Sequence, residues 1–162
     1  MNKKAEQLIV RRHSRIECDI QCRLHIDEDH TEQIVLSRSV THADGSVAVR
    51  VVDCSQGGLG IESAVYLPHG SHVVVQIDPD NIDGLQKTTT FHLRVQRGEM
   101  IARSPRYYMG TSLLERGSTK EAIDQLLAVT SQSNEDHQDT QNPHDSDTQA
   151  AEPTSSQSME GT

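Results

Sequence analysis

Two short polar groups in this chain have the residue types and spacing needed to hold an anionic or purine ligand. The first is Arg11-Arg12-His13-Ser14-Arg15, which places Arg11 and Arg15 in the spacing RxxxR. Guanidinium groups present forked N–H donors that fit phosphate oxygens and the O6/N7 edge of guanine. Because RxxxR alone is a weak signal in a chain rich in arginine, a solvated basic N-terminus is the alternative interpretation.

The second group is Asp53-Cys54-Ser55-Gln56-Gly57-Gly58, of the form DxSxxG. The Asp53 carboxylate can accept hydrogen bonds from the N–H groups of a guanine edge, and the Ser55 hydroxyl adds a short, adaptable bond. Glycines such as Gly58 let the chain turn sharply and let a flat ligand approach the backbone. Asp, Ser and Gly are also common in ordinary turns, so a plain turn between strands is equally compatible with this segment.

Short strands must position both groups. From Glu17 to Ile26 apolar and polar residues alternate, which predicts a half-buried antiparallel strand. Further strands are expected at Ile34–Thr41, Val47–Asp53, Leu59–Ser63, His72–Asp78, Thr90–Gly98 and Tyr107–Glu115. Turn signals at Ala43-Asp44-Gly45-Ser46 and Pro68-His69-Gly70 separate some of them. About seven short strands predict an all-β, mainly antiparallel fold, a small closed or nearly closed barrel.

The C-terminal part of the chain divides into a helix and an acidic tail. Ser118-x-x-Glu121 has the form of a capping box, and apolar residues at helical spacing follow it, so a short helix is expected from about Thr119 to Val129. Residues 131–162 hold seven acids and no Lys or Arg, which predicts a disordered acidic tail and leaves the rest of the chain close to neutral. The expected organisation is a flexible basic loop (1–15), a barrel with its helix (16–130) and the tail (131–162).

Composition excludes several classes of protein. The mean hydropathy is −0.61 and no apolar run approaches the ~20 residues of a membrane span or the core of a signal peptide. Three cysteines without a CxxC favour a reduced, cytoplasmic protein. With no Trp and 2% aromatic residues, modules that stack nucleic-acid bases on exposed rings are disfavoured.

No metal site or catalytic constellation can be assembled from the sequence. Cys18 and Cys22 share a strand face, but His25 lies on the opposite face, so the three side chains cannot converge on a metal. A nucleophilic Cys54 has no base identifiable by spacing. We therefore expect no cofactor and no enzymatic activity.

Taken together and in this order, the two motifs resemble the PilZ domain, a bacterial receptor module for cyclic di-GMP. The resemblance covers roughly residues 8–130. It extends to Gly58-Leu59-Gly60-Ile61, to the turn at Leu67-x-x-Gly70, and to Tyr107–Leu114, which is similar to the closing strand of the family. It implies a six- or seven-stranded antiparallel barrel with a C-terminal helix.

The resemblance also implies roles for six residues. Arg11 and Arg15 in a flexible loop would grip guanine and phosphate, with assistance from Arg12, while the barrel surface would hold the other guanine through Asp53, Ser55 and Gly58. Val10, just before the first arginine, favours one bound ligand over a stacked pair. The interval between the motifs, residues 16–52, is long for the family, and the polar stretch 27–32 would absorb the surplus as a loop.

The expected function is therefore a cytoplasmic cyclic di-GMP receptor that signals through an unidentified protein partner in motility, biofilm or polysaccharide control. A PilZ-fold interaction scaffold that does not bind nucleotide is the first alternative. A small barrel that binds nucleic acid through its basic N-terminus is the second, and both the scarce aromatics and the acidic tail disfavour it.

Overall fold

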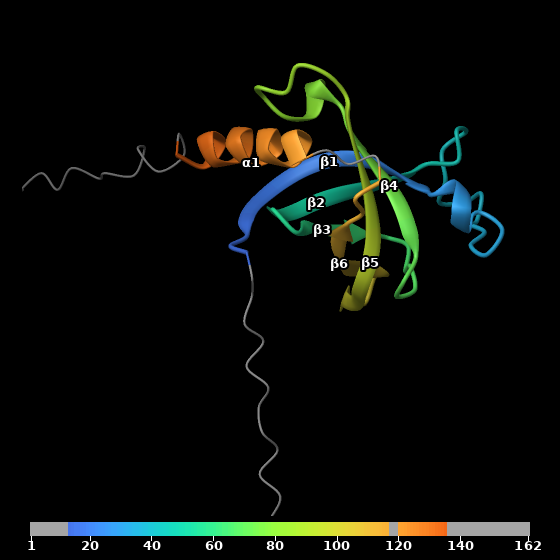
Figure 1. Cartoon of the computed structure of the whole chain (residues 1–162). Coiled ribbons are helices and arrows are strands. Elements are labelled where there is room, and N and C mark those ends of the chain that lie inside the picture. The colour runs from blue at the N-terminus through green and yellow to red at the C-terminus, as the bar shows by residue number, and fades with distance from the viewer. Residues whose placement is uncertain (1–12, 117–119, 136–162) are drawn as a thin grey trace, which may run out of the picture.

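The strands of the computed structural model, which describes residues 13–116 and 120–135, form one closed barrel (Figure 1). They are β1 (Ile16–Ile26), β2 (Val47–Ser55), β3 (Gly58–Ser63), β4 (His72–Ile77), β5 (Thr89–Ala102) and β6 (Arg106–Leu113). The order around the barrel is β1-β2-β3-β6-β5-β4, and every neighbouring pair is antiparallel. The predicted all-β antiparallel barrel is confirmed.

The core is the inward face of the strands. In β1 the alternation read from the sequence buries Ile20, Cys22 and Leu24 and exposes the residues between them wholly or partly. Inward residues of the other strands meet them, with Phe91 as the largest fully buried side chain. Because successive side chains of a strand point to opposite faces, the outer faces of the same strands remain available for a ligand.

One predicted strand is absent from the barrel. Residues 34–41 form a loop without ladder hydrogen bonds, although Ile34 and Leu36 are half-buried against the core and Val35 is exposed. The predicted alternation of buried and exposed side chains is therefore present, but both edges of β1 are already paired, one with β2 and the other with β4. A closed barrel offers no free edge on which a seventh strand could pair, so the prediction of a strand here was wrong.

Helix α1 (Lys120–Glu135) packs against β1, β2 and β5 and buries Ile123, Leu126 and Val129. It is longer than predicted and continues past Val129 to Glu135, and the hydroxyls of Thr130, Ser131 and Ser133 donate to carbonyls one turn earlier. Residues 131–135, expected to belong to the tail, are therefore helical; Ser118 and residues 136–162 lie outside the described residues. No helix in the described ranges is long and apolar enough to cross a membrane.

A buried carboxylate follows β1. Asp27 is only 3% exposed and accepts hydrogen bonds from His92 Nδ1 (3.1 Å), Arg116 Nη2 (3.0 Å) and the Asp29 amide (3.3 Å). Burial acts to raise the pKa of Asp27, but the bonds from His92 and Asp29 and the charge of Arg116 outweigh it and lower the pKa below its ordinary value. Through His92 this cluster connects the end of β1 to β5, and through Arg116 it connects β1 to the segment after β6. The Leu114 amide of that segment also donates to the His92 carbonyl of β5.

Candidate ligand-binding site

A β-bulge in β2 turns Asp53 out of the barrel. Val49 and Val51 point into the core, so an uninterrupted strand would also point Asp53 inward. The pairing of β2 with β3 shifts between Val51 and Asp53, which leaves Val52 as an extra residue and reverses the alternation. As a result Cys54 is fully buried, and the carboxylate of Asp53 lies on the outer surface with 15% of its side chain exposed.

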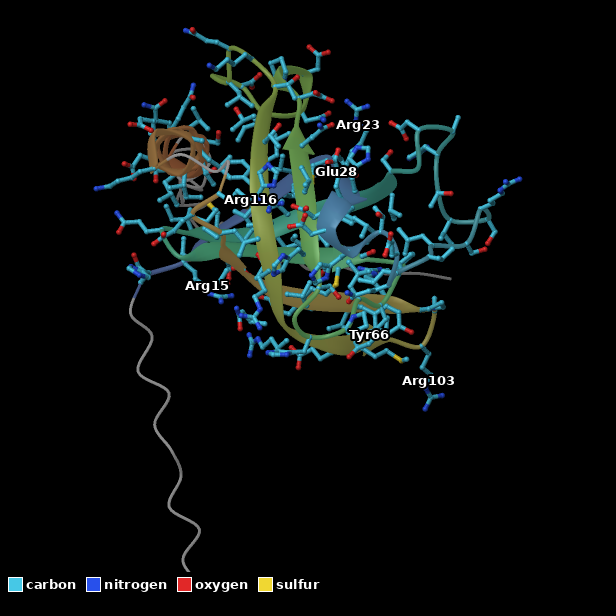
Figure 2. The ribbon with its side chains drawn as sticks, turned by 45° about the vertical axis from the view of Figure 1, so that its right-hand side comes forward. Arg15, Arg23, Glu28, Tyr66, Arg103 and Arg116 are labelled. Carbon is cyan, nitrogen blue, oxygen red and sulfur yellow. The ribbon has the colours of Figure 1, made fainter. Side chains whose placement is uncertain are left out.

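The two sequence motifs meet at this carboxylate. Arg15, 38 residues earlier in the chain, donates from Nη1 to Asp53 Oδ1 at 2.9 Å. The same Nη1 donates to the hydroxyl of Tyr108 at 2.6 Å, and that hydroxyl donates to Asp53 Oδ2 at 2.8 Å. Arg15 directly precedes β1 (Figure 2), and its side chain is 31% exposed. Its Nη2 and Nε have no partner among the described residues, so they remain available to a ligand.

The triad borders a surface hollow of about 510 Å³. Its lining contains Arg15 and Asp53, as the motifs predict, together with Tyr108 of β6 and Arg97 of β5. The guanidinium carbon of Arg97 lies 5.5 Å from the centroid of the Tyr108 ring, within the range of a cation–π contact. Neither residue was predicted from the sequence as part of a site, because no motif marks them.

Ser55 and Gly58 build the hairpin between β2 and β3. The Ser55 hydroxyl donates to the Gly58 carbonyl at 3.2 Å and accepts from the Gly57 amide at 3.3 Å, and the side chain is nearly buried. A β-carbon at Gly58 would collide with the Thr111 carbonyl oxygen of β6, so only glycine fits there. Both residues therefore shape the hairpin, and neither lines the hollow beside Arg15 and Asp53. Arg11 and Arg12 lie outside the described residues.

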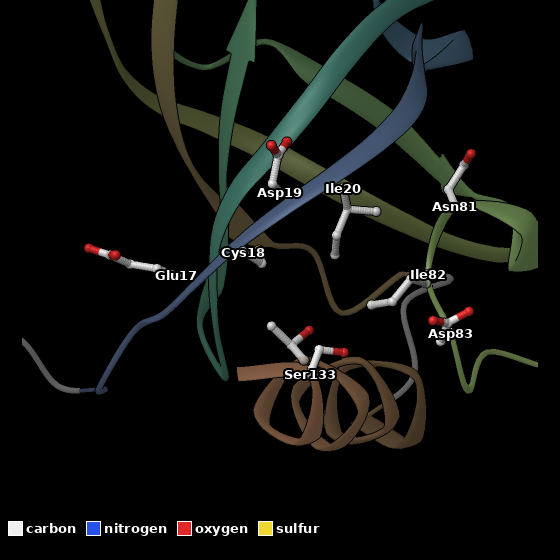
Figure 3. A pocket seen from close by; sticks show the side chains of 9 residues that line it. Glu17, Cys18, Asp19, Ile20, Asn81, Ile82, Asp83 and Ser133 are labelled. Carbon is white, nitrogen blue, oxygen red and sulfur yellow. The ribbon is translucent and has the colours of Figure 1, made fainter. Parts of the chain in front are cut away.

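A second hollow, of about 430 Å³, lies between β1, α1 and the loop before β5 (Figure 3). Its charged lining residues are all acidic, namely Glu17, Asp19 and Asp83. Carboxylates repel a phosphate-bearing ligand, so this hollow is the weaker candidate for an anion.

Cys18, Cys22 and Cys54 are free thiols, of which Cys22 and Cys54 are buried. Burial raises the pKa of the Cys22 thiol to about 12, which keeps it neutral. The pKa of Cys18 is also raised, first by its hydrogen bond with Cys54 and then by burial. Among the described residues, no group of three or more His, Cys, Asp or Glu side chains could hold a metal ion.

Comparison with known proteins identifies the family. The family model described as "PilZ domain" matches residues 9–128. The chain belongs to the PilZ family. This match confirms the resemblance seen in the sequence and spans both motifs. Among curated proteins, no sequence matches the chain.

Solved structures share the fold of this PilZ domain. YcgR from Escherichia coli in complex with c-di-GMP has a TM-score of 0.50 and 16% identity over 80% of this chain and 49% of its own. The Bacillus subtilis inhibitor of motility MotI/DgrA has a TM-score of 0.51 and 12% identity over 82% of this chain and 54% of its own. The K. pneumonia MrkH–c-di-GMP complex has a TM-score of 0.52 and 15% identity over 80% of this chain and 56% of its own. The chain thus spans about half the length of each of these proteins.

Proposed function

We propose that this PilZ domain is a receptor for cyclic di-GMP, which binds in the hollow between Arg15 and Asp53. The observation that carries the proposal is the meeting of the two motifs: Arg15 and Asp53, 38 residues apart, share one hydrogen-bonded network beside an open hollow. A carboxylate has about four lone-pair sites, so Asp53 can accept from a guanine edge without releasing Tyr108. Two of the solved relatives, YcgR and MrkH, are described as complexes with this dinucleotide.

The charges of the hollow explain why the basic N-terminus is needed. Among the described lining residues two arginines, Arg15 and Arg97, face two carboxylates, Glu17 and Asp53. This part of the site is therefore nearly neutral, whereas cyclic di-GMP carries two phosphates. We propose that Arg11 and Arg12 supply the additional positive charge and close over the ligand.

Closure of that segment would change the surface beside β1, and we propose that a protein partner recognises the changed surface. The role proposed is that of a non-catalytic cytoplasmic receptor without a cofactor. Val10 before the arginine pair supports a single bound ligand.

Calorimetric titration of the full chain with cyclic di-GMP, with GTP as the control ligand, tests the proposal. Arg15→Ala and Asp53→Asn should each weaken binding at least tenfold, because each removes a charge-assisted contact. Arg103→Ala is the matched control, since Arg103 lies in the β5–β6 turn well separated from Arg15 (Figure 2). Wild-type affinity in both site variants would refute the site. If folded wild-type protein does not bind the dinucleotide, the result would favour the alternative function, a PilZ-fold interaction scaffold that does not bind nucleotide.

A further inference from the structure

A single cross-strand row of residues connects Asp53 to an arginine that neither motif contains. The pairing runs from Asp53 on β2 to Gly60 on β3, then to Gly110 on β6 and to Arg97 on β5. Three strand spacings of about 4.8 Å place the Cα atoms of Asp53 and Arg97 about 14 Å apart. Between them the two glycines leave a strip of backbone without side chains of its own, on which the side chains of Asp53 and Arg97 lie.

Arg97 faces the hollow for the same reason as Asp53. Val95 is buried in the core, so an uninterrupted β5 would point Arg97 into the barrel. The pairing of β5 with β6 shifts between Val95 and Arg97, which leaves Gln96 as the extra residue and turns Arg97 outward. Two bulges on different strands thus aim one carboxylate and one guanidinium at the same strip. Bulges commonly re-aim side chains beside functional sites.

Both charged side chains lean inward over the glycines. A β-carbon at Gly60 would overlap the Asp53 carboxyl group, and one at Gly110 would lie 3.1 Å from Nε and 3.2 Å from Cγ of Arg97. Tyr108 stands beside the strip, with its hydroxyl bonded to Asp53 and its ring under the Arg97 guanidinium. Arg97 forms no ion pair with any described residue, so its donors are not committed to a carboxylate.

This arrangement matches the two edges of one guanine base. Guanine carries N–H donors at N1 and N2 on one edge, which suit a carboxylate, and acceptors at O6 and N7 on another, which suit a guanidinium fork. Resting on the proposed cyclic di-GMP function, we infer that Arg97 binds the O6/N7 edge of the guanine whose donor edge faces Asp53. Arg97 is then a specificity-determining residue. Adenine presents an amino group where guanine has O6, so Arg97 rejects it.

The test measures binding of cyclic di-GMP and, by competition, cyclic di-AMP to the full chain. Arg97→Ala should weaken cyclic di-GMP binding by roughly 5- to 100-fold, the range of one bidentate base contact, and should leave cyclic di-AMP binding unchanged. Arg97→Lys should recover little, because an ammonium group cannot reproduce the fork. Arg94→Ala, an exposed arginine of the same strand that does not line the hollow, is the matched control.

Each outcome decides the inference. Loss of selectivity in Arg97→Ala, with a melting temperature equal to that of the control, supports it. An equal loss for both dinucleotides would assign Arg97 to a phosphate and overturn it, as would wild-type affinity in Arg97→Ala. If the wild-type chain binds cyclic di-GMP normally, either of those results leaves the proposed function intact. Absence of binding by the wild-type chain would instead refute the proposed function and this inference with it.

Discussion

Replacement of Gly60 by alanine separates the binding function of the hollow from the stability of the barrel. Gly60 lies in extended backbone of β3, so an alanine there meets no conformational penalty. Its β-carbon, however, would lie 2.5 Å from Asp53 Cγ and 2.7 Å from Oδ1. The neighbouring strand cannot move without disturbing the ladder, so the short Asp53 side chain must rotate away from Arg15 and Tyr108.

The expected loss of stability is small. Breaking a half-exposed ion pair and one hydrogen bond to a carboxylate costs about 1–2 kcal/mol after allowance for solvent screening of the pair. Replacing glycine by alanine in an extended strand stabilises the folded state by about 0.5–1 kcal/mol, because the unfolded chain has less conformational entropy. The net change of at most about 1.5 kcal/mol corresponds to a fall in Tm of roughly 6 °C or less for a domain of this size.

The expected loss of binding is much larger. A carboxylate that can no longer reach the guanine edge forfeits a charge-assisted contact worth about 2–5 kcal/mol, which is at least about 30-fold in Kd. Calorimetry with cyclic di-GMP measures this loss, and thermal unfolding measures the change in stability. Gly98→Ala is the matched control, because its β-carbon would meet the movable ring of the half-exposed Tyr66 and would lie at ordinary van der Waals distance, 3.7 Å, from the Leu67 carbonyl oxygen. Wild-type affinity in a folded Gly60→Ala protein would refute the role of the Asp53 carboxylate in binding the ligand.

Two further predictions concern other contacts of the structure. Tyr108→Phe removes the hydroxyl that links Arg15 to Asp53 but keeps the ring under Arg97, so we expect a roughly fivefold weaker Kd for cyclic di-GMP in calorimetry; an unchanged Kd would show that the hydroxyl does not position the carboxylate. Because the pKa of Asp27 is lowered by folding, its ionised form contributes stability above the unfolded value of 3.8, and this contribution is lost as the pH falls through the lower folded pKa. Acid titration followed by circular dichroism should therefore show a shallower loss of stability below about pH 4 in Asp27→Asn than in the wild type, and parallel curves would contradict the assignment.

Period-two patterns in the sequence predicted most of the barrel but could not show which strands pair. The alternation in β1 located the strand and its buried face, since burial follows directly from side-chain direction. Residues 34–41 carry the same pattern without forming a strand, because pairing depends on a free sheet edge and closure of the barrel removes every edge. Likewise the polar composition of residues 131–135 predicted a tail, whereas the helix continues through them.

The motifs predicted two residues of the proposed site, and the bulges explain why Arg97 and Tyr108 were not predicted. Arg15 and Asp53 belong to spaced motifs, whereas Arg97 and Tyr108 lie on strands without one and join the hollow only through strand register. A signal was nevertheless present. Asp53 and Arg97 each occupy a position where the apolar alternation of the strand demands an inward side chain, and a charge at such a position indicates a bulge.

Mapping the ligand on the full chain by ¹H–¹⁵N NMR tests the central claim most directly. With saturating cyclic di-GMP, the account predicts the largest shifts at the amides of Asp53, Gly60 and Gly110 and at the side-chain Nε–H groups of Arg15 and Arg97. Shifts concentrated instead at the hollow between β1 and α1, or no shifts in a folded protein, would contradict it.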